Sequence, residues 1–358
     1  MSSSTETGSA QLAATRPGFK LRPAVKLSDN NLVEQQVFPG NTGLPLVITP
    51  KIKGVNLLDW IKEKKTQLES DLLNYGGLLF RDFNLQGVDD FQAALKAIGI
   101  QTMNYIEKAT PRQQIEGQVY TSTIFPTDQI IALHNELSYV KQWPGRIAFF
   151  CEVAPTTEGE TPIADVRRVL ARIDPEVQDK FRKLGWLLIR NFGYGIGPSW
   201  QHSLSVTTQQ EAEAYMRQSE IQWQWLGAER LRTCQVRSAI RRHPVSKAEL
   251  WFNHIAFWHP SSMPEQVRQS LIDDLGWENL PYNTLYGDGS VIPDDVIAHL
   301  RAAYQAETVK FTWQAGDLLL LDNMLVAHGR SRFSGERRIL TAMGDEIRPA
   351  SVAPGSLD

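Results

Sequence analysis

Short runs of apolar, β-branched and aromatic residues recur along the chain after about residue 117, separated by glycine, proline and other turn-forming residues. Runs of this length predict strands, and many short strands in succession indicate an antiparallel sandwich or barrel. The predicted strands cover residues 118–125, 130–134, 146–153, 185–192, 248–258, 309–314, 317–323 and 337–345. The pattern therefore predicts a mainly β core.

The region before these runs mixes helix and strand. Residues 56–77 begin with Asn56, a good helix cap, and place their apolar residues on roughly one helical face. Gly76 is expected to end this helix, because glycine is favoured just after a helix C-terminus. A strand over 78–83 and a short helix over 89–99 are expected to follow.

Helical patterns also interrupt the predicted strands in the middle of the chain. Residues 174–185 start with an Asp cap and a proline at the first helical position, which is where proline is tolerated. Similar patterns cover 207–218, 263–276 and 293–305. The simplest architecture is one β core with a long helical insertion, roughly residues 165–300, between its early and late strands.

Composition adds limits to this picture. Residues 1–18 are rich in Ser, Thr, Ala and Gly and are expected to form a disordered tail, with 19–358 as a single domain. Hydrophobic residues make up 42% of the 358 residues and charged residues 22%, which is typical of a soluble globular protein. The two cysteines, Cys151 and Cys234, show no metal-binding spacing and fit a reducing cytosol.

Charge and hydropathy exclude several classes of partner. The net charge of −3 gives no reason to expect nucleic acid or an anionic membrane surface. No run of about 18 apolar residues is present, so no membrane span is expected. The first residues have neither a basic start nor an apolar stretch, so a signal peptide is not expected. We therefore expect a cytoplasmic soluble protein.

Two stretches carry candidate chemistry. LHNELSY, residues 133–139, sets His134 and Glu136 two positions apart, which alone is a weak signal. DLLLLDNMLVAHGRSRFSGERRIL, residues 317–340, contains His328. Together they offer two imidazoles and one carboxylate, the ligand set of non-haem Fe(II) oxygenases. Three protein ligands would leave three coordination positions for a bidentate 2-oxo acid and dioxygen.

The second stretch also supplies a cation. A strand, a turn and a returning strand would bring His328 close to Arg337 or Arg338, and strand alternation allows only one of these arginines to point inward. Arginine suits the distal carboxylate of 2-oxoglutarate, because its planar fork pairs with a carboxylate through two hydrogen bonds. Thr161, between a glycine turn and a proline, could add a hydroxyl beside that carboxylate.

With these motifs the chain resembles the taurine dioxygenase (TauD/TfdA) and clavaminate synthase-like superfamily of Fe(II)/2-oxoglutarate-dependent dioxygenases. Its nearest branch looks like the amino acid hydroxylases of nonribosomal peptide pathways and their plant clavaminate synthase-like relatives. The motifs that carry the resemblance are GGLLFRDF, LHNELSY, GETPIAD, ELWFNH, WQAGDLLLLDN and AHGRSRFSGERRIL. They extend from about residue 76 to 345, so the resemblance covers most of the chain.

The resemblance implies a double-stranded β-helix (jelly roll) with a helical insertion. It implies His134, Glu136 and His328 as ligands of Fe(II), with O2 as oxidant, and Thr161 and Arg338 as the 2-oxoglutarate-binding residues. Many relatives have Asp at the Glu136 position, and related halogenases have Ala or Gly there. Glu136 therefore argues against halogenation.

Other residues near these motifs have weaker assignments. Ser122, Tyr139 and Asn253 lie beside the expected iron and are candidate substrate contacts. His254 and His259, in the aromatic run WFNHIAFWH, are interpreted as core residues rather than further ligands.

The leading hypothesis is hydroxylation of an unactivated C–H bond, coupled to oxidative decarboxylation of 2-oxoglutarate to succinate. The resemblance implies an amino acid or a derivative as substrate, free or tethered to a peptidyl carrier protein, in specialised metabolism. Desaturation or cyclisation with the same cofactors remains open. Two other classes are a non-catalytic jelly-roll protein that binds a small acid and a zinc hydrolase, and neither explains Arg338 and Thr161 together with an intact ligand set.

Overall fold

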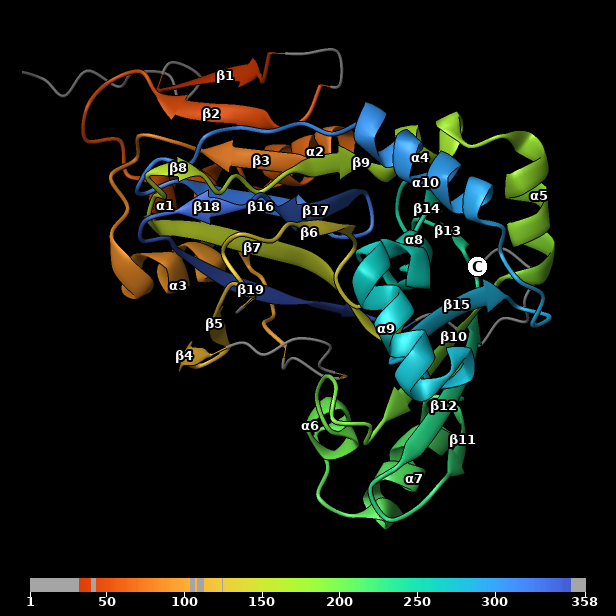
Figure 1. Ribbon diagram of the computed structural model, residues 1–358. Helices are drawn as coiled ribbons and strands as arrows, with labels where there is room; N and C mark the ends of the chain where they lie inside the picture. Colours follow the sequence, from red (N-terminus) through yellow and green to blue (C-terminus); the bar gives the residue numbers. More distant parts are fainter. Residues whose placement is uncertain (1–31, 40–42, 104–106, 108–112, 124, 349–358) are drawn as a thin grey trace, which may run out of the picture.

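The computed structural model describes residues 32–39, 43–103, 107, 113–123 and 125–348. Its centre is an eight-stranded sheet (Figure 1). The strands follow the order β1 (Val33–Val37), β2 (Leu46–Pro50), β3 (Gly77–Phe80), β16 (Leu318–Asp322), β7 (Trp143–Val153), β19 (Arg338–Ile347), β5 (Val119–Thr121) and β4 (Gln114–Glu116). All described pairs are antiparallel except β2 with β3. The predicted disordered tail, residues 1–18, lies outside the described residues.

A smaller sheet completes the β core. It consists of β6 (Ile131–His134), β17 (Val326–Arg330) and β9 (Ile163–Asp165), with β17 in the middle. A two-stranded pair, β8 (Thr157–Glu158) and β18 (Phe333–Ser334), adjoins it. The jelly roll expected from the resemblance is confirmed.

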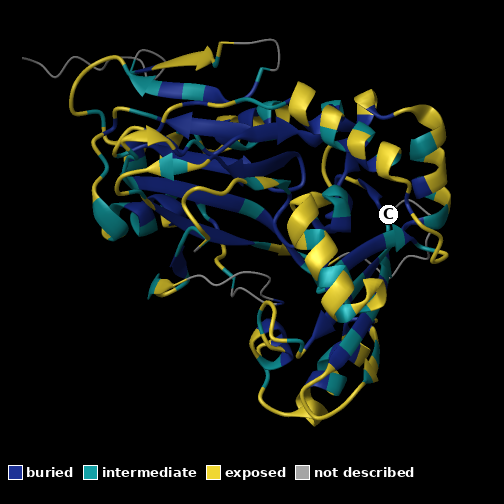
Figure 2. Cartoon of the chain, in the orientation of Figure 1, coloured by how far each residue is buried: buried dark blue, intermediate teal, exposed yellow. Residues whose placement is uncertain are grey.

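The large sheet is buried on both faces, which explains why its central strands are almost continuously apolar. In β16, Leu319 and Leu321 belong to the core shared with the small sheet and the insertion, whereas Leu318 and Leu320 face the N-terminal helices. Strand β7 divides its side chains between the two faces in the same way. Figure 2 shows these strands as largely buried, with exposed residues concentrated on the outer helices and loops.

Three helices cover the outer face of the large sheet: α1 (Leu57–Glu63), α2 (Lys65–Tyr75) and α3 (Gly87–Ile98). Asn56 caps α1 as predicted, because its side chain accepts hydrogen bonds from the backbone N–H groups of Leu58 and Asp59. The predicted single helix over 56–77 is divided in two at Lys64, whose backbone is not helical (φ −104°, ψ 19°). Gly76 ends α2 in the left-handed conformation, as predicted.

The insertion is not purely helical, so that prediction is corrected. Its helices are α4 (Val166–Arg172), α5 (Pro175–Leu184), α6 (Trp200–Leu204), α7 (Gln209–Gln218), α8 (Ile255–Trp258), α9 (Glu265–Leu275) and α10 (Asp294–Ala306), with 3-10 turns η2 (Pro260–Ser262) and η3 (Trp277–Asn279). A four-stranded antiparallel sheet accompanies them, in the order β11 (Gln222–Trp225), β12 (Leu231–Arg237), β10 (Trp186–Phe192) and β15 (Tyr282–Tyr286), together with the hairpin β13 (Ile240–Arg242) and β14 (Glu249–Trp251).

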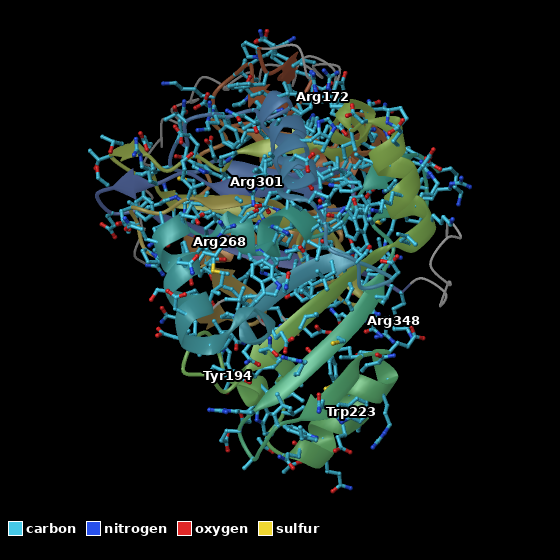
Figure 3. The ribbon with its side chains drawn as sticks, turned by 45° about the vertical axis from the view of Figure 1, so that its right-hand side comes forward. Arg172, Tyr194, Trp223, Arg268, Arg301 and Arg348 are labelled. Atoms are coloured by element: carbon cyan, nitrogen blue, oxygen red, sulfur yellow. The ribbon has the colours of Figure 1, made fainter. Side chains whose placement is uncertain are left out.

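The insertion sheet lies beside the jelly roll. In Figure 3 the insertion comes forward, with Arg268 of α9 and Arg301 of α10 above the sheet and Trp223 of β11 near its lower end. The run 185–192 was expected in the β core, but it forms β10 and pairs with β12 and β15 of the insertion. A strand's own residues do not identify its partner, which explains this error.

Two further predicted strands differ from the structure. Residues 248–258 form the short strand β14 and then helix α8, because the Asn253 side chain accepts a hydrogen bond from the N–H of Ile255 and starts a helical turn. Residues 309–314 form no regular strand and make only one isolated bridge, Val309 with Ile163. Among the described residues, no helix has the length and apolar character needed to cross a bilayer.

A buried ion pair ties β3 to the loop before β16. The Arg81 guanidinium donates to both carboxylate oxygens of Asp317 at 3.0 and 2.6 Å, and Asp317 is 1% exposed. We expect Asp317→Ala to lower the free energy of unfolding by about 3 kcal/mol, since it leaves a partly buried cation without its partner. Chemical denaturation would measure this loss. Lys62→Met, which breaks the exposed Lys62–Asp59 pair, is the control and should have a far smaller effect.

Candidate active site

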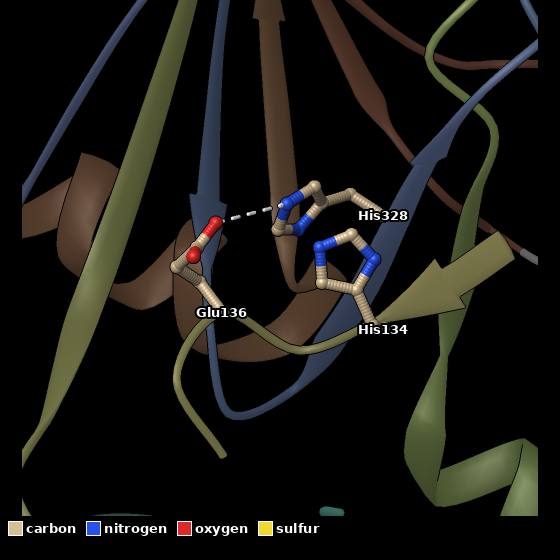
Figure 4. A group of neighbouring side chains, drawn as sticks. All are labelled: His134, Glu136 and His328. Carbon is tan, nitrogen blue, oxygen red and sulfur yellow. Dashed lines mark ion pairs between the residues drawn. The ribbon is translucent and has the colours of Figure 1, made fainter. Parts of the chain in front are cut away.

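The structure brings His134, Glu136 and His328 together where strand β6 of the small sheet ends (Figure 4). His134 is the last residue of β6, and its register partner on β17 is His328. Glu136 lies two residues beyond His134, in the turn that follows β6. One ligand atom from each of the three side chains lies within 4.8 Å of the others.

The ring of His134 is oriented for ligation by a hydrogen bond to its own strand. Its Nδ1 lies 2.9 Å from the carbonyl oxygen of Ala132. A carbonyl oxygen only accepts, so Nδ1 carries the proton and Nε2 carries the lone pair that can bind a metal ion. Backbone carbonyls commonly fix the tautomer of metal-binding histidines in this way.

His328 and Glu136 face each other across the same space. The Nε2 atom of His328 lies 3.7 Å from a carboxylate oxygen of Glu136, and both residues are 4% exposed. The Nδ1 atom of His328 is buried without a hydrogen-bond partner among the described residues. Two imidazoles and one carboxylate gathered on one side of a space match the facial ligand set of non-haem Fe(II), so these residues fit that ion.

Asn323, in the turn between β16 and β17, fixes the backbone of Glu136. Its side-chain oxygen accepts from the Glu136 N–H at 2.8 Å, and its amide donates to the Glu136 carbonyl at 2.9 Å. The same amide also donates to the Pro144 carbonyl at 2.8 Å. Asn323 is fully buried. No role was predicted for Asn323, which lies within the motif WQAGDLLLLDN.

The residue before Asn323 ties this turn to the insertion. One carboxylate oxygen of Asp322 accepts from the N–H groups of Met324 and Leu325, which shapes the entry into β17. The other oxygen lies 3.1 Å from Nε2 of His243, which follows β13. Because Nδ1 of His243 accepts backbone N–H groups, its Nε2 is the donor to Asp322. The insertion therefore supports the turn that carries the ligands.

A pocket adjoins the two histidines. It is lined by Ser122, Thr123, Ile131, His134, Phe149, Thr161, His328, Gly329, Arg330 and Arg337. Thr161 is 2% exposed, and its hydroxyl oxygen accepts from Nε1 of Trp313 at 3.1 Å. Thr161 therefore lies in the same pocket as the two histidines, while its predicted contact with 2-oxoglutarate stays a prediction.

The arginine at position 337 lines this pocket, and the predicted Arg338 does not. Arg337 donates to the carbonyl of Gly159 at 2.9 Å and to the hydroxyls of Ser122 and Thr161 at 3.2 and 3.5 Å. Arg338 begins β19, is 47% exposed and forms an ion pair with Glu152 at 2.6 Å.

Alternation along β19 explains this correction. Ile339 faces the core shared with the small sheet, so Arg337, two residues before it, lies on that inner side. Leu340 faces the N-terminal helices, which places Arg338 on the other side. The sequence predicts that neighbouring side chains of a strand point to opposite faces. It does not show whether Arg337 or Arg338 points inward.

A second arginine, the buried Arg330, also lines the pocket, and no role was predicted for it. It lies two residues after His328 and donates to three carbonyls of the preceding loop, those of Phe125, Pro126 and Gln129, at 3.0, 2.5 and 3.0 Å. Burial, with the nearby Arg330 charge, lowers the pKa of Arg337 to about 10. A pocket lined by two guanidinium groups, that of the buried Arg330 and that of the partly buried Arg337, favours an anionic ligand.

The three candidate substrate residues lie in different surroundings. Ser122 lines the pocket and accepts a hydrogen bond from Arg337. Tyr139 is 1% exposed and donates to the backbone carbonyl of Glu107 at 2.6 Å. The Asn253 side chain donates to the carbonyl of Ala239 and accepts from the N–H of Ile255. The structure therefore does not place Tyr139 or Asn253 in the pocket.

His254 packs against the ligands without joining them. Its ring centroid lies 5.4 Å from that of His134, and its Nδ1 lies 2.6 Å from the Ser138 hydroxyl. Burial and the neighbouring histidines hold the pKa of His254 well below its usual range, so it is neutral at physiological pH. Its interpretation as a core residue agrees with this placement.

A jelly roll whose facing strands gather two histidines and one carboxylate beside a cationic pocket defines an Fe(II)- and 2-oxoglutarate-dependent oxygenase. The model of the taurine catabolism dioxygenase TauD, TfdA family matches residues 41–343, and the chain belongs to this family. Fe(II) is its cofactor, and 2-oxoglutarate and O2 are its co-substrates. The family expected from the sequence motifs is confirmed.

Two curated relatives support this membership. The dapdiamide synthesis protein DdaC of Enterobacter agglomerans is 39% identical over 284 residues, covering 79% of this chain and 86% of DdaC. A clavaminate synthase-like protein of Arabidopsis thaliana is 28% identical over 337 residues, covering 87% of this chain and 96% of that protein.

Solved structures share the fold. The PvcB protein of Pseudomonas aeruginosa matches with a TM-score of 0.53 at 14% identity, over 89% of this chain and 93% of that chain. Another PvcB structure, described as an Fe, alpha-ketoglutarate dependent oxygenase from an isonitrile synthetic pathway, gives 0.51 at 16% identity, over 88% and 92%.

The role of Asn323 can be separated from general stability. Asn323→Ala removes the hydrogen bonds that its side chain makes with the N–H and the carbonyl of Glu136. We therefore expect a stability loss of about 1–3 kcal/mol and a 10–100-fold weaker affinity for Mn(II), on the order seen when a ligand's supporting bond is removed. Calorimetric titration with Mn(II) would measure the affinity.

Asn191→Ala is the matched control, because Asn191 is also a buried asparagine whose side chain makes three hydrogen bonds, but it lies in the insertion sheet. It should lose stability and keep Mn(II) affinity. Equal affinities in the two variants would contradict the role of Asn323.

Proposed function

We propose that the protein hydroxylates an unactivated C–H bond of an amino acid or an amino-acid-derived substrate, free or carried on a peptidyl carrier protein. The observation that carries this proposal is the group His134, Glu136 and His328 beside the pocket of Arg337 and Thr161. The relation to DdaC, a dapdiamide synthesis protein, supports a substrate of this kind and a place in specialised metabolism. Glu136 supports oxygenation over halogenation, because it occupies the position that a halide would need.

The proposed ligands of Fe(II) are His134 and His328, each through an imidazole nitrogen, and Glu136 through its carboxylate. Arg337, with the hydroxyl of Thr161, is the proposed partner of the distal carboxylate of 2-oxoglutarate. This assignment replaces Arg338, whose guanidinium is engaged with Glu152 on the other side of β19. Ser122 lies within reach of the same carboxylate through its contact with Arg337.

Bound Fe(II) supplies the activation of dioxygen that is coupled to decarboxylation of 2-oxoglutarate. The chain's own residues position the reactants and exclude water. Arg337 and Arg330 compensate the negative charge of the co-substrate in a buried setting, where that charge would otherwise be costly. Phe149 and Ile131 form an apolar wall of the pocket, which limits the entry of water.

Formation of succinate from 2-oxoglutarate by the Fe(II)-loaded enzyme tests this function. We expect a panel of amino acids, free and carrier-bound, to contain a compound that stimulates turnover and appears as a product heavier by one oxygen atom in mass spectrometry. His134→Ala should abolish both signals. If every compound left succinate formation at the substrate-free rate, an amino-acid-derived substrate would be excluded.

A matched pair of variants tests the co-substrate site. Arg337→Met should raise the KM for 2-oxoglutarate about 10–100-fold, because it removes charge-assisted hydrogen bonds to a carboxylate. Arg338→Met, one residue along the chain and on the other side of β19, should leave that KM unchanged. Steady-state succinate assays would give both values, and the reverse result would restore the assignment of Arg338.

A further inference from the structure

The hydroxyl of Thr161 accepts hydrogen bonds from two donors in the structure. Its Oγ1 accepts from the indole N–H of Trp313 at 3.1 Å and from Nη2 of Arg337 at 3.5 Å. Indole and guanidinium N–H groups only donate, so neither neighbour uses the hydroxyl proton of Thr161. Because Thr161 lines the pocket beside the histidines, that proton is available to an acceptor bound in the pocket.

Trp313 is held beside Thr161 by packing and by a backbone bridge. It is 3% exposed, and its ring meets that of Phe311 in an edge contact at 4.9 Å. Earlier in the same segment, Val309 exchanges two backbone hydrogen bonds with Ile163, at 2.8 and 2.9 Å. Ile163 is only two residues beyond Thr161, so the bridge aligns the segment of Trp313 with the strand that begins after the threonine.

The Arg81–Asp317 ion pair fixes the backbone on both sides of Trp313. Nη2 of Arg81 donates to the carbonyl of Thr312 at 2.8 Å. On the other side, the carboxylate of Asp317 accepts from the N–H of Gln314 at 2.8 Å. The two charged side chains also bond to each other, at 3.0 and 2.6 Å. The pair therefore fixes both neighbours of Trp313 and, with them, the direction of its indole.

The hydrogen bond of Trp313 distinguishes it from other buried tryptophans of this chain. Five of these have a buried Nε1 with no hydrogen-bond partner among the described residues: Trp60, Trp143, Trp186, Trp200 and Trp251. An indole can thus be buried in this fold without a partner for its N–H. Packing alone therefore does not account for the contact between Trp313 and Thr161.

We propose that Trp313 is a positioning residue for 2-oxoglutarate, because its N–H occupies a lone pair of Thr161 and turns the hydroxyl proton toward the distal carboxylate. This inference rests on the proposed function, in which Arg337 and Thr161 bind that carboxylate. A carboxylate only accepts, so it gains a hydrogen bond when the hydroxyl already points its proton into the pocket. Fixing this direction before binding lowers the cost of ordering the hydroxyl when 2-oxoglutarate arrives.

Calorimetric titration of the Mn(II)-loaded protein with 2-oxoglutarate measures this effect without turnover. Trp313→Phe keeps an aromatic ring and removes the N–H, and we expect it to raise the Kd for 2-oxoglutarate about 5-fold. Thr161→Val removes the hydroxyl and should raise this Kd about 10-fold, because a hydrogen bond to a charged group is lost. The affinity for Mn(II) should stay unchanged in both variants, which shows that the metal site is intact.

Double variants decide whether Trp313 acts through Thr161. In the Thr161→Val background, Trp313→Phe should raise the Kd for 2-oxoglutarate no further, because no hydroxyl remains to be oriented. In the Thr161→Ser background, which keeps a hydroxyl, the effect of Trp313→Phe should persist. If Trp313→Phe raised the Kd by the same factor in the wild-type and Thr161→Val backgrounds, the proposal would be overturned, since Trp313 would then act without the hydroxyl.

Trp60→Phe is the matched control. Trp60 is also buried, but its N–H has no partner among the described residues, and it packs against the outer face of the large sheet. This variant should keep the wild-type Kd for 2-oxoglutarate.

Arg81→Lys is a second variant, which decides the matter if thermal unfolding shows that Trp313→Phe does not fold. It leaves Trp313 in place and keeps a cation beside Asp317, but a lysine has no planar fork to bond Asp317 and the Thr312 carbonyl together. We expect it to raise the Kd for 2-oxoglutarate about 3-fold, and only where the Thr161 hydroxyl is present. A wild-type Kd in Arg81→Lys would contradict the positioning of Trp313 by the ion pair.

This inference and the proposed function can fail separately. If Thr161→Val and Arg337→Met both kept the wild-type Kd, 2-oxoglutarate would not bind as proposed, and the role of Trp313 would fail with that site. If Thr161→Val weakened binding and Trp313→Phe did not, only the role of Trp313 would fail. Hydroxylation of an amino-acid-derived substrate is tested by product formation, which these titrations do not involve.

Discussion

The active site depends on one antiparallel pairing, that of β6 with β17, and on the turn that leads into β17. The pairing sets His134 opposite His328, and Asn323 in the turn holds both backbone groups of Glu136. All three side chains are thereby fixed by two short paired segments, β6 with the turn that follows it and β17 with the turn that leads into it. Close packing resists displacement of such a segment, so the ligand geometry is set by the fold before an ion binds.

Buried positive charge is the second constraint. Arg337 and Arg330 share the pocket beside the histidines, and the lowered pKa of Arg337 reflects burial together with their mutual repulsion. Arg330 donates hydrogen bonds to three loop carbonyls, whereas Arg337 donates to one carbonyl and two hydroxyls. The proposed binding of 2-oxoglutarate at Arg337 would complete this arrangement, because a carboxylate pairs well with a guanidinium group.

Much of the fold could be predicted from local pattern. The strands β7, β16 and β19 follow from their apolar runs, and the ends of the N-terminal helical region follow from Asn56 and Gly76. The insertion sheet could not be predicted in this way, because the residues of β10 do not show whether that strand pairs within the core or outside it. The break at Lys64 and the helix after Asn253 also depend on contacts that local pattern does not contain.

The sequence by itself determined the types of residue at the site and their family, because the motifs around His134 and His328 combine a ligand set with a specific order. Tertiary structure alone decided which arginine faces the pocket, that Asn323 supports Glu136, and that Trp313 donates to Thr161. The physical reason is that side-chain direction in a strand depends on which face the sheet buries. That choice is made by partners that are distant in the chain.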